Sequence, residues 1–320
     1  MTAPLLQDWT PQQRRAYRRE IVTFQNRLEE TGLFSDEALA RLLDRHPRGS
    51  LDVLTMGRDK TDRKSWAAGD YEGLSGAELI EAARRGRLWI NVRHAMDEDA
   101  EYKRVFDRLL REFQAQTGGP KVLKAMGGIL ISSPNAQVFY HCDRTDTMLW
   151  HVRGEKTMYV WPAADPFLTE ADYEALILKE TLEDIPYDPR FDAHAVAVPM
   201  TPGSSVAWPL HGPHRVVNGN SLNVSVTIEY STADCVMTNA VYFTHAVLRR
   251  RLGLHARSRS VPGALKPAYL AASRLLQPLA PRSNAFKAHG RKFDVDPSAP
   301  DCVRWKPGFE PAAEPVRAAA

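Results

Sequence analysis

The chain has 320 residues, 43% hydrophobic and 25% charged, with a formal net charge of +3. That composition is typical of a globular protein with a sizeable core, and so weak a charge argues against nucleic acid as a partner. No signal-peptide pattern and no apolar run of eighteen residues is visible, so we expect no membrane span. Three widely spaced cysteines, Cys142, Cys235 and Cys302, predict neither a disulfide framework nor a zinc cluster and favour a cytoplasmic location.

The first region, residues 1–118, is expected to be mostly helical and to pack on the domain that follows. Ser35 is suited to cap one helix, and Ser75 with Glu78 forms a capping-box pattern ahead of another, which Gly86 ends. From the spacing of apolar residues, helices are predicted over residues 12–30, 36–44, 75–86 and 100–115.

Residues 119–235 change to short β-rich pieces separated by turn residues, which indicates an all-β sandwich or barrel. An insertion at 163–194 interrupts this region and carries a short helix around Glu170 to Lys179. The predicted strands are the run after Gly127-Gly128, then 137–142, 148–152, 157–161, 195–199, 205–208, 215–217 and 222–230.

Residues 236–280 are predicted to be helical again, and residues 281–320, rich in proline, alanine and charge, are predicted to be a mobile tail. The apolar stripe of Phe243, Val247, Leu248 and Leu252 either packs on its own domain or forms a homodimer contact. A basic run is read either as a solvated helix end or as a binding patch; its members are Arg249, Arg250, Arg251, Arg257 and Arg259.

The sequence Tyr140-His141-Cys142-Asp143 carries the chemistry. Residues two apart on a strand project to one face, so His141 and Asp143 are placed to hold one ion. A histidine from another strand would complete the two-histidine, one-carboxylate set of non-haem Fe(II) oxygenases, which leaves open positions on the metal. Taken alone, such a triplet is common on protein surfaces.

The second histidine is His211 or His214. His214 opens a predicted strand, where the backbone holds a ligand in place, whereas His211 lies in a Pro/Gly loop; we therefore predict His214 as the ligand and His211 as a rim residue. Lys156, fifteen positions after His141, is a suitable point charge for the distal carboxylate of 2-oxoglutarate, and otherwise an ordinary strand-end lysine. The polar face of the last strand, with Thr227 and Glu229, lines either a cavity or solvent.

Taken in order, His141-x-Asp143, Gly154-x-Lys156, Trp161-Pro162, Pro202-Gly203 and Pro209-x₄-His214 resemble the JmjC, or cupin-like, superfamily of oxygenases. The nearest group is that of the hypoxia-inducible-factor asparagine hydroxylase, and the resemblance covers about residues 125–232. It implies a mainly β fold with helical additions: a double-stranded β-helix (jelly roll) flanked by N-terminal and C-terminal helices.

The resemblance further implies His141, Asp143 and His214 as catalytic Fe(II) ligands and Lys156 as the anchor for 2-oxoglutarate. Thr147 and Thr227 lie near its cosubstrate-binding polar positions. Where the family has threonine, three residues before the first histidine, this chain has Val138, and Tyr140 or Ser132 is expected to supply the missing hydroxyl.

With O₂ as the second cosubstrate, the implied activity is hydroxylation of a C–H bond in a protein, peptide, amino-acid side chain or other small molecule, with release of succinate and CO₂. Three alternatives stay open: an N-demethylase, a cupin enzyme that needs no 2-oxoglutarate, and a non-catalytic cupin-like binding or regulatory protein. The resemblance favours a homodimer through the C-terminal helices.

The insertion is expected to shape the substrate entrance. Its acidic residues either form a rim that favours a basic substrate or belong to a solvated helix; they are Asp165, Glu170, Asp172, Glu174, Glu180, Glu183 and Asp184.

Overall fold

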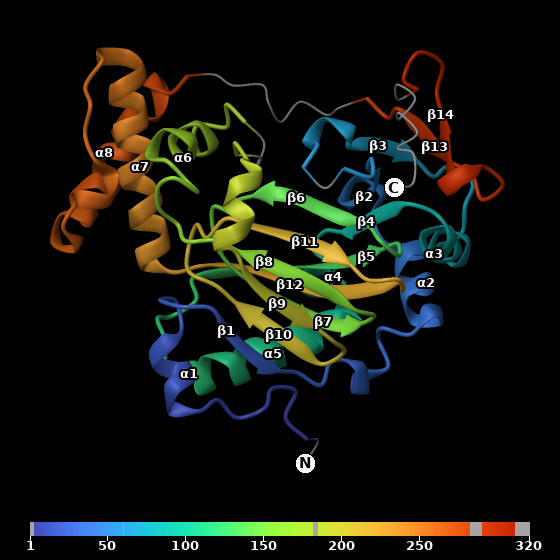
Figure 1. Ribbon diagram of the computed structural model, residues 1–320. Helices are drawn as coiled ribbons and strands as arrows, with labels where there is room; N and C mark the ends of the chain where they lie inside the picture. The colour runs from blue at the N-terminus through green and yellow to red at the C-terminus, as the bar shows by residue number, and fades with distance from the viewer. Residues whose placement is uncertain (1–2, 60, 182–184, 282–289, 311–320) are drawn as a thin grey trace.

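The computed structural model describes residues 3–59, 61–181, 185–281 and 290–310 (Figure 1). Two sheets face each other at its centre, both antiparallel except that β13 pairs with β3 in parallel. The larger has the strand order β1-β10-β7-β12-β5-β4-β2-β3-β13-β14 and the smaller the order β6-β11-β8-β9. The eight central strands alternate between the sheets as in a jelly roll, except that β8 and β9 pair with each other in the small sheet. They are β5 (Lys124–Ser132), β6 (Gln137–His141), β7 (Asp146–Arg153), β8 (Lys156–Val160), β9 (Val196–Met200), β10 (Ser204–Ala207), β11 (His214–Asn218) and β12 (Asn223–Ser231).

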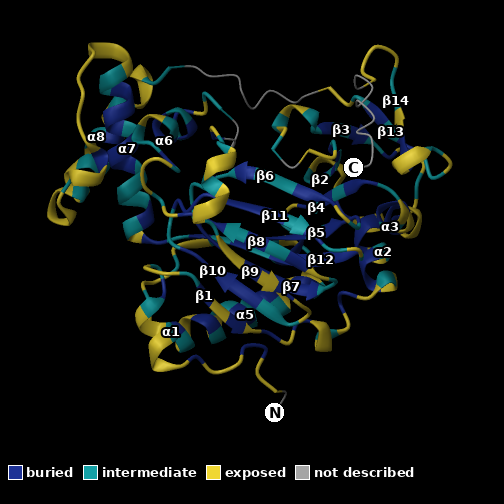
Figure 2. Cartoon of the chain, viewed as in Figure 1, coloured by how far each residue is buried: buried dark blue, intermediate teal, exposed yellow. Residues whose placement is uncertain are grey.

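This strand order confirms the predicted double-stranded β-helix, and all eight central strands match predicted ones. The alternation of side chains along each strand supplies two cores. On β7, Leu149 faces the barrel interior with Met158 and Val216, whereas Trp150 faces outward into the core under the N-terminal helices. Both faces of the large sheet are therefore covered, and Figure 2 shows its strands as the most deeply buried part of the molecule.

The N-terminal region contains the predicted helices and also strands that the sequence reading missed. Ser35 and the Ser75–Glu78 capping box begin their helices as predicted. These helices cover the outer face of the large sheet, α5 most directly (Figure 1). The helices are α1 (Pro11–Ala16), α2 (Asp36–Arg45), α3 (Gly76–Arg85), α4 (Ala95–Glu98) and α5 (Ala100–Thr117).

The predicted helix over residues 12–30 is wrong beyond Ala16. Arg18 has a left-handed backbone with φ of 65°, and the chain then runs as β1 beside β10. Val22 and Phe24 are buried while their neighbours on the strand are exposed. Burial thus alternates with the period of two of a strand, although the apolar residues of the segment also fit the helical period of 3.6. The strands that extend the large sheet from this region are β1 (Val22–Gln25), β2 (Leu51–Thr55), β3 (Ala67–Asp70) and β4 (Leu88–Val92).

Residues C-terminal to the barrel form α7 (Ala233–Leu252) and α8 (Lys266–Leu276), which lie beside the insertion helix α6 (Glu170–Ile177) at one end of the molecule (Figure 1). The insertion helix and both C-terminal helices agree with prediction. Among the described residues, no helix has both the length and the apolar character needed to cross a bilayer.

The prediction of a mobile tail over residues 281–320 is wrong for the described part, residues 290–310. β13 (Phe293–Val295) pairs with β3 and with β14 (Val303–Trp305) at the far edge of the large sheet. The Phe293 side chain is fully buried over Gly69, where a Cβ atom would lie 2.2 Å from its ring. Strands of three residues are too short to show a period in a proline-rich segment. The rest of the predicted tail lies outside the described residues.

The acidic insertion and the basic run pair with each other, which corrects the expectation of an acidic rim. Glu174 is fully buried and accepts from Arg249 at 2.8 Å, and Arg250 and Glu180 approach to 2.9 Å. Arg259 similarly reaches Asp165 at 3.1 Å. These ion pairs attach the insertion to the C-terminal helices, so little of this acidic charge is left for a substrate. Glu183 and Asp184 lie outside the described residues.

Candidate metal centre and cosubstrate pocket

His141 and His214 lie opposite each other on the paired strands β6 and β11, and their ring centroids are 4.0 Å apart. A β-bulge aims His141 inward: four residues of β6, from Val138 to His141, match three of β11, from Val216 to His214. Val138 and His141 therefore both line the barrel cavity, although strict alternation would place them on opposite faces.

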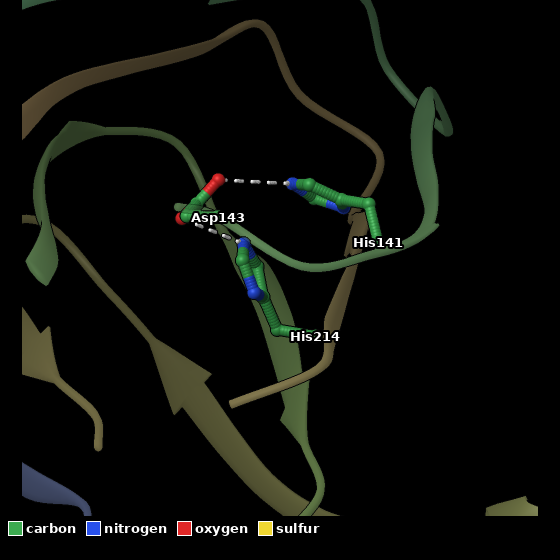
Figure 3. Close-up of side chains that lie close together, drawn as sticks. All are labelled: His141, Asp143 and His214. Carbon is green, nitrogen blue, oxygen red and sulfur yellow. Dashed lines mark ion pairs between the residues drawn. The ribbon is translucent and has the colours of Figure 1, made fainter. Parts of the chain in front are cut away.

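Asp143 follows the end of β6 and turns back toward the two histidines (Figure 3). Its carboxylate oxygens lie 4.0 Å from His141 Nε2 and 3.6 Å from His214 Nε2. One ligand atom from each of the three residues lies within 4.8 Å of the other two. The structure thus brings together the three residues that the sequence predicted.

The hydrogen bonds of both imidazoles leave Nε2 free for a metal. His141 Nδ1 donates to the Phe139 carbonyl at 2.8 Å, and His214 Nδ1 donates to the Gly212 carbonyl at 3.0 Å. This arrangement is usual for histidine ligands of metals, because the outer hydrogen bond fixes the tautomer and the ring orientation. Burial and the neighbouring His141 lower the pKa of His214 to about 4, so its ring is neutral at physiological pH. The donor set fits Fe(II).

A cavity of about 150 Å³ opens beside these three residues. One wall comes from the small sheet and carries the histidines; the opposite wall comes from the large sheet and carries polar groups of β4, β7 and β12. The lining side chains are Trp89, Asn91, Leu130, Val138, His141, Asp143, Thr147, Leu149, Met158, Trp208, His214, Val216, Thr227 and Glu229.

Lys156 lies deeper in the barrel, in a pocket that shares five lining residues with the metal cavity. Its side chain is buried, with Ser132 and Asn218 beside it, and Asn218 donates to the Ser132 hydroxyl at 2.8 Å. Burial lowers the pKa of Lys156 to about 7. Within the described ranges, no hydrogen-bond acceptor and no carboxylate contacts its ammonium group. A buried ammonium without an anion is costly, so this pocket is suited to an anionic ligand.

The other residues predicted to bind the cosubstrate lie in three different places. Thr147 and Thr227 line the metal cavity, and Ser132 lines the lysine pocket. Tyr140 does not: it lies on the outer face of the small sheet, where its hydroxyl donates to the Phe167 carbonyl at 2.8 Å and its ring packs on Trp161. The bulge that turns His141 inward turns Tyr140 outward.

Three cavity residues were missed or undervalued in the sequence reading. Trp89 and Asn91 come from β4, in the region predicted to be helical, although they alternate with the buried Leu88, Ile90 and Val92. Glu229 confirms that the polar face of β12 looks into the cavity, where its carboxylate accepts from Thr145 at 3.4 Å. Burial and the charge of Asp143 raise its pKa to about 7.

His211 is neither a ligand nor a rim residue. It is buried outside the barrel, with its ring stacked 3.9 Å from that of Tyr173 and its Nε2 3.0 Å from Asn239 Oδ1. The proline and glycine around it had indicated an exposed loop, but the insertion helix covers that loop.

No protein-family model and no curated protein matches the sequence. Among solved structures, the chain is similar to Escherichia coli YcfD: 17% identity, a TM-score of 0.49, and coverage of 87% of this chain and 70% of that one. Another structure of this protein, described as a ribosomal oxygenase, gives 17% identity, a TM-score of 0.47, and coverage of 87% and 69%. A complex of the same oxygenase with cobalt and 2-oxoglutarate gives 17%, 0.47, and coverage of 86% and 68%. At this level of similarity, the fold assignment rests on the strand order of the chain itself.

Proposed function

We propose that this chain is an Fe(II)- and 2-oxoglutarate-dependent oxygenase that hydroxylates a C–H bond of a protein, peptide or amino-acid side chain. One observation carries the proposal: a two-histidine, one-carboxylate cluster and a buried ammonium without a counter-ion occupy two connected parts of one barrel interior. The cluster suits iron, and the ammonium suits the far end of a dicarboxylate.

The spacing of the two parts suits a five-carbon dicarboxylate. His214 pairs with Val160 on β8, and Lys156 precedes Val160 by four residues, about 13 Å along the strand. Lys156 and Met158 both face the barrel interior. The Lys156 side chain therefore extends into the interior space that leads toward the proposed metal position. Bound there, Fe(II), 2-oxoglutarate and O₂ would supply oxidation of a C–H bond with release of succinate and CO₂.

The residues of this chain divide the remaining work. His141, Asp143 and His214 hold the metal on one face and leave the others to ligands. Lys156 neutralises the distal carboxylate, and the Ser132 hydroxyl, which accepts from Asn218, offers a hydrogen bond beside it. The apolar walls, with Leu149, Met158 and Val216, keep water out of the reaction. Thr227 and Glu229 face the substrate side of the cavity.

A succinate assay with Fe(II), ascorbate, 2-oxoglutarate and candidate peptides tests the activity. A hydroxylase should give succinate and a peptide heavier by one oxygen. An N-demethylase should also give succinate, but with formaldehyde in place of the heavier peptide. No succinate above background would favour a binding protein. Lys156→Met should lose turnover while Lys103→Met, an exposed lysine on α5, should not; equal activity of the two would favour a cupin enzyme that needs no 2-oxoglutarate.

We further propose a cytoplasmic homodimer. Cys142, Cys235 and Cys302 are all free, as expected in a reducing compartment.

Of the predicted stripe, Phe243 and Val247 pack within their own chain, but leucines nearby are more than half exposed. They are Leu252, Leu254, Leu265, Leu275 and Leu279. Sedimentation velocity should show a dimer that Leu275→Glu dissociates and that Leu123→Glu, an equally apolar exposed site elsewhere, leaves intact.

A further inference from the structure

Asp143 is the one member of the triad that no strand holds. His141 and His214 belong to β6 and β11, whose ladder hydrogen bonds fix their backbones, but Asp143 lies in the segment that follows β6. Its position therefore depends on what holds its two neighbours, Cys142 and Arg144. Cys142 is fully buried and its thiol donates to the His211 carbonyl at 3.2 Å. The segment of Asp143 is thus tied to the loop that leads into His214.

A single amide on α7 joins the same two segments from outside the barrel. Asn239 Nδ2 donates to the Arg144 carbonyl at 2.7 Å, and Asn239 Oδ1 accepts from His211 Nε2 at 3.0 Å. The same oxygen accepts from the Tyr173 hydroxyl at 2.6 Å, which brings in the insertion helix. These partners fix the orientation of the amide, with the oxygen toward two donors and the nitrogen toward a carbonyl.

The partners of Asn239 are themselves rigid. His211 has a left-handed backbone with φ of 64°, and its ring is packed between those of Tyr173 and Tyr242 at 3.9 and 5.8 Å. Asn239 itself is half-buried, and its amide makes these three hydrogen bonds to groups of its own chain. Movement of the Asp143 segment away from the histidines would break the bond between Asn239 Nδ2 and the Arg144 carbonyl.

We infer that Asn239 is a positioning residue of the metal centre, which sets Asp143 against His214 by bridging the two segments that carry them. The inference rests on the proposed metal site. It makes α7 and the insertion helix α6 parts of that site, although neither contributes a ligand. Asn239 bonds neighbours of the ligands and not the ligands themselves, so its loss should weaken metal binding by about 10-fold, the lower end of the range for groups that bond a ligand directly.

The test compares Asn239→Asp with Thr244→Val in the full chain. Aspartate keeps the acceptor for Tyr173 and His211 but cannot donate to the Arg144 carbonyl. Thr244 is a buried residue of the same helix whose hydroxyl donates to the Tyr269 carbonyl, away from the metal segments. Co(II) titration, followed by its visible spectrum, should show about 10-fold weaker binding and a changed spectrum for Asn239→Asp. Thr244→Val should match the wild type in both.

A second readout needs no metal. In metal-free protein, alkylation of Cys142 followed by mass spectrometry should be several-fold faster in Asn239→Asp, with Cys302 as an unchanged internal reference. Wild-type Co(II) affinity and wild-type Cys142 reactivity in Asn239→Asp would overturn the inference, even if the variant melted earlier. A wild-type chain that binds no Co(II) would instead overturn the proposed function, and Cys142 reactivity would still decide whether Asn239 holds the segment.

Discussion

At one end of the barrel cavity both histidines have their second ring nitrogen bonded to a backbone carbonyl; at the other, Lys156 has no acceptor in the part of the chain that the structure describes. The metal end has its outer hydrogen bonds in place before any ligand arrives. The lysine end holds a buried amine whose charged form has no counter-ion among the described residues. In the proposed function, an anion would therefore be selected by a desolvated amine, and a metal by the geometry of its ligands.

The strongest test of the metal end removes its ligands. His141→Ala and Asp143→Ala should each abolish Fe(II)-dependent turnover, because two remaining donors hold the metal too weakly. His211→Ala, which removes a hydrogen bond outside the cluster, should lower metal affinity by only about 10-fold. Turnover and Co(II) calorimetry measure both effects. Loss of turnover in His211→Ala with none in His214→Ala would show that His211, and not His214, is the ligand.

At the lysine end, Lys156→Met should have effects of opposite sign on binding and stability. The cosubstrate loses its counter-ion, so its Kd should rise by about 10²- to 10³-fold, equivalent to about 3–4 kcal/mol. The ligand-free protein loses an unpaired buried charge and should melt at a higher temperature. The pKa of Lys156 is about 7 in the folded chain, against the usual 10.5. Its buried charge therefore lowers the free energy of unfolding fully below pH 7, and less and less as the pH rises toward 10.5. The stability gained by replacing it with methionine should be larger at pH 6 than at pH 10. Weaker binding together with lower stability would contradict an unpaired lysine.

The same lysine predicts a pH dependence for the cosubstrate. The ammonium form binds the carboxylate, and burial brings the pKa of Lys156 to about 7, so affinity for 2-oxoglutarate should fall as the pH rises from 7 to 9. Lys156→Arg keeps its charge throughout this range and should flatten the profile. Calorimetry at constant ionic strength measures both chains. An identical decline in the arginine variant would show that another group causes it, and Glu229, whose pKa is also about 7, would be the candidate.

The smallest effect is expected for Glu229→Gln in metal-free protein. Burial and Asp143 raise the pKa of Glu229 to about 7, so the folded chain holds an extra proton between about pH 4.5 and 7. The free energy of unfolding therefore decreases as the pH rises through that window. Glutamine removes this dependence and should be more stable than the wild type by on the order of 2 kcal/mol at pH 8, with little difference at pH 4. Denaturant titrations with a chelator present measure it; a difference independent of pH would contradict the buried carboxyl.

Much of the barrel could be predicted because its strands are regular. Along β12, Val224, Val226 and Ile228 alternate with polar residues, and the structure places the two sets on opposite faces. The same regularity identified His214 at the start of β11. The triad was within reach because its members occur in short motifs near strand ends.

The errors arose where local pattern and tertiary contact disagree. The bulge in β6 shifts the alternation by one residue, so Tyr140 was expected inside the cavity and lies outside it. Residues 12–30 contain apolar residues at both periods, and pairing of β1 with β10 decides between them. Asn239 has no motif at all: its role depends on three partners 28 to 95 residues away in the sequence.

Anaerobic titration of the purified protein with Fe(II) and then 2-oxoglutarate, followed by visible absorption, tests the two ends together. A chelated 2-oxo acid on Fe(II) gives a charge-transfer band, so the wild type should develop this band at one equivalent of each. Asp143→Ala should develop none, and Lys156→Met should require a far higher 2-oxoglutarate concentration. A wild-type protein that binds Fe(II) but gives no band with 2-oxoglutarate would contradict a cavity built to hold both.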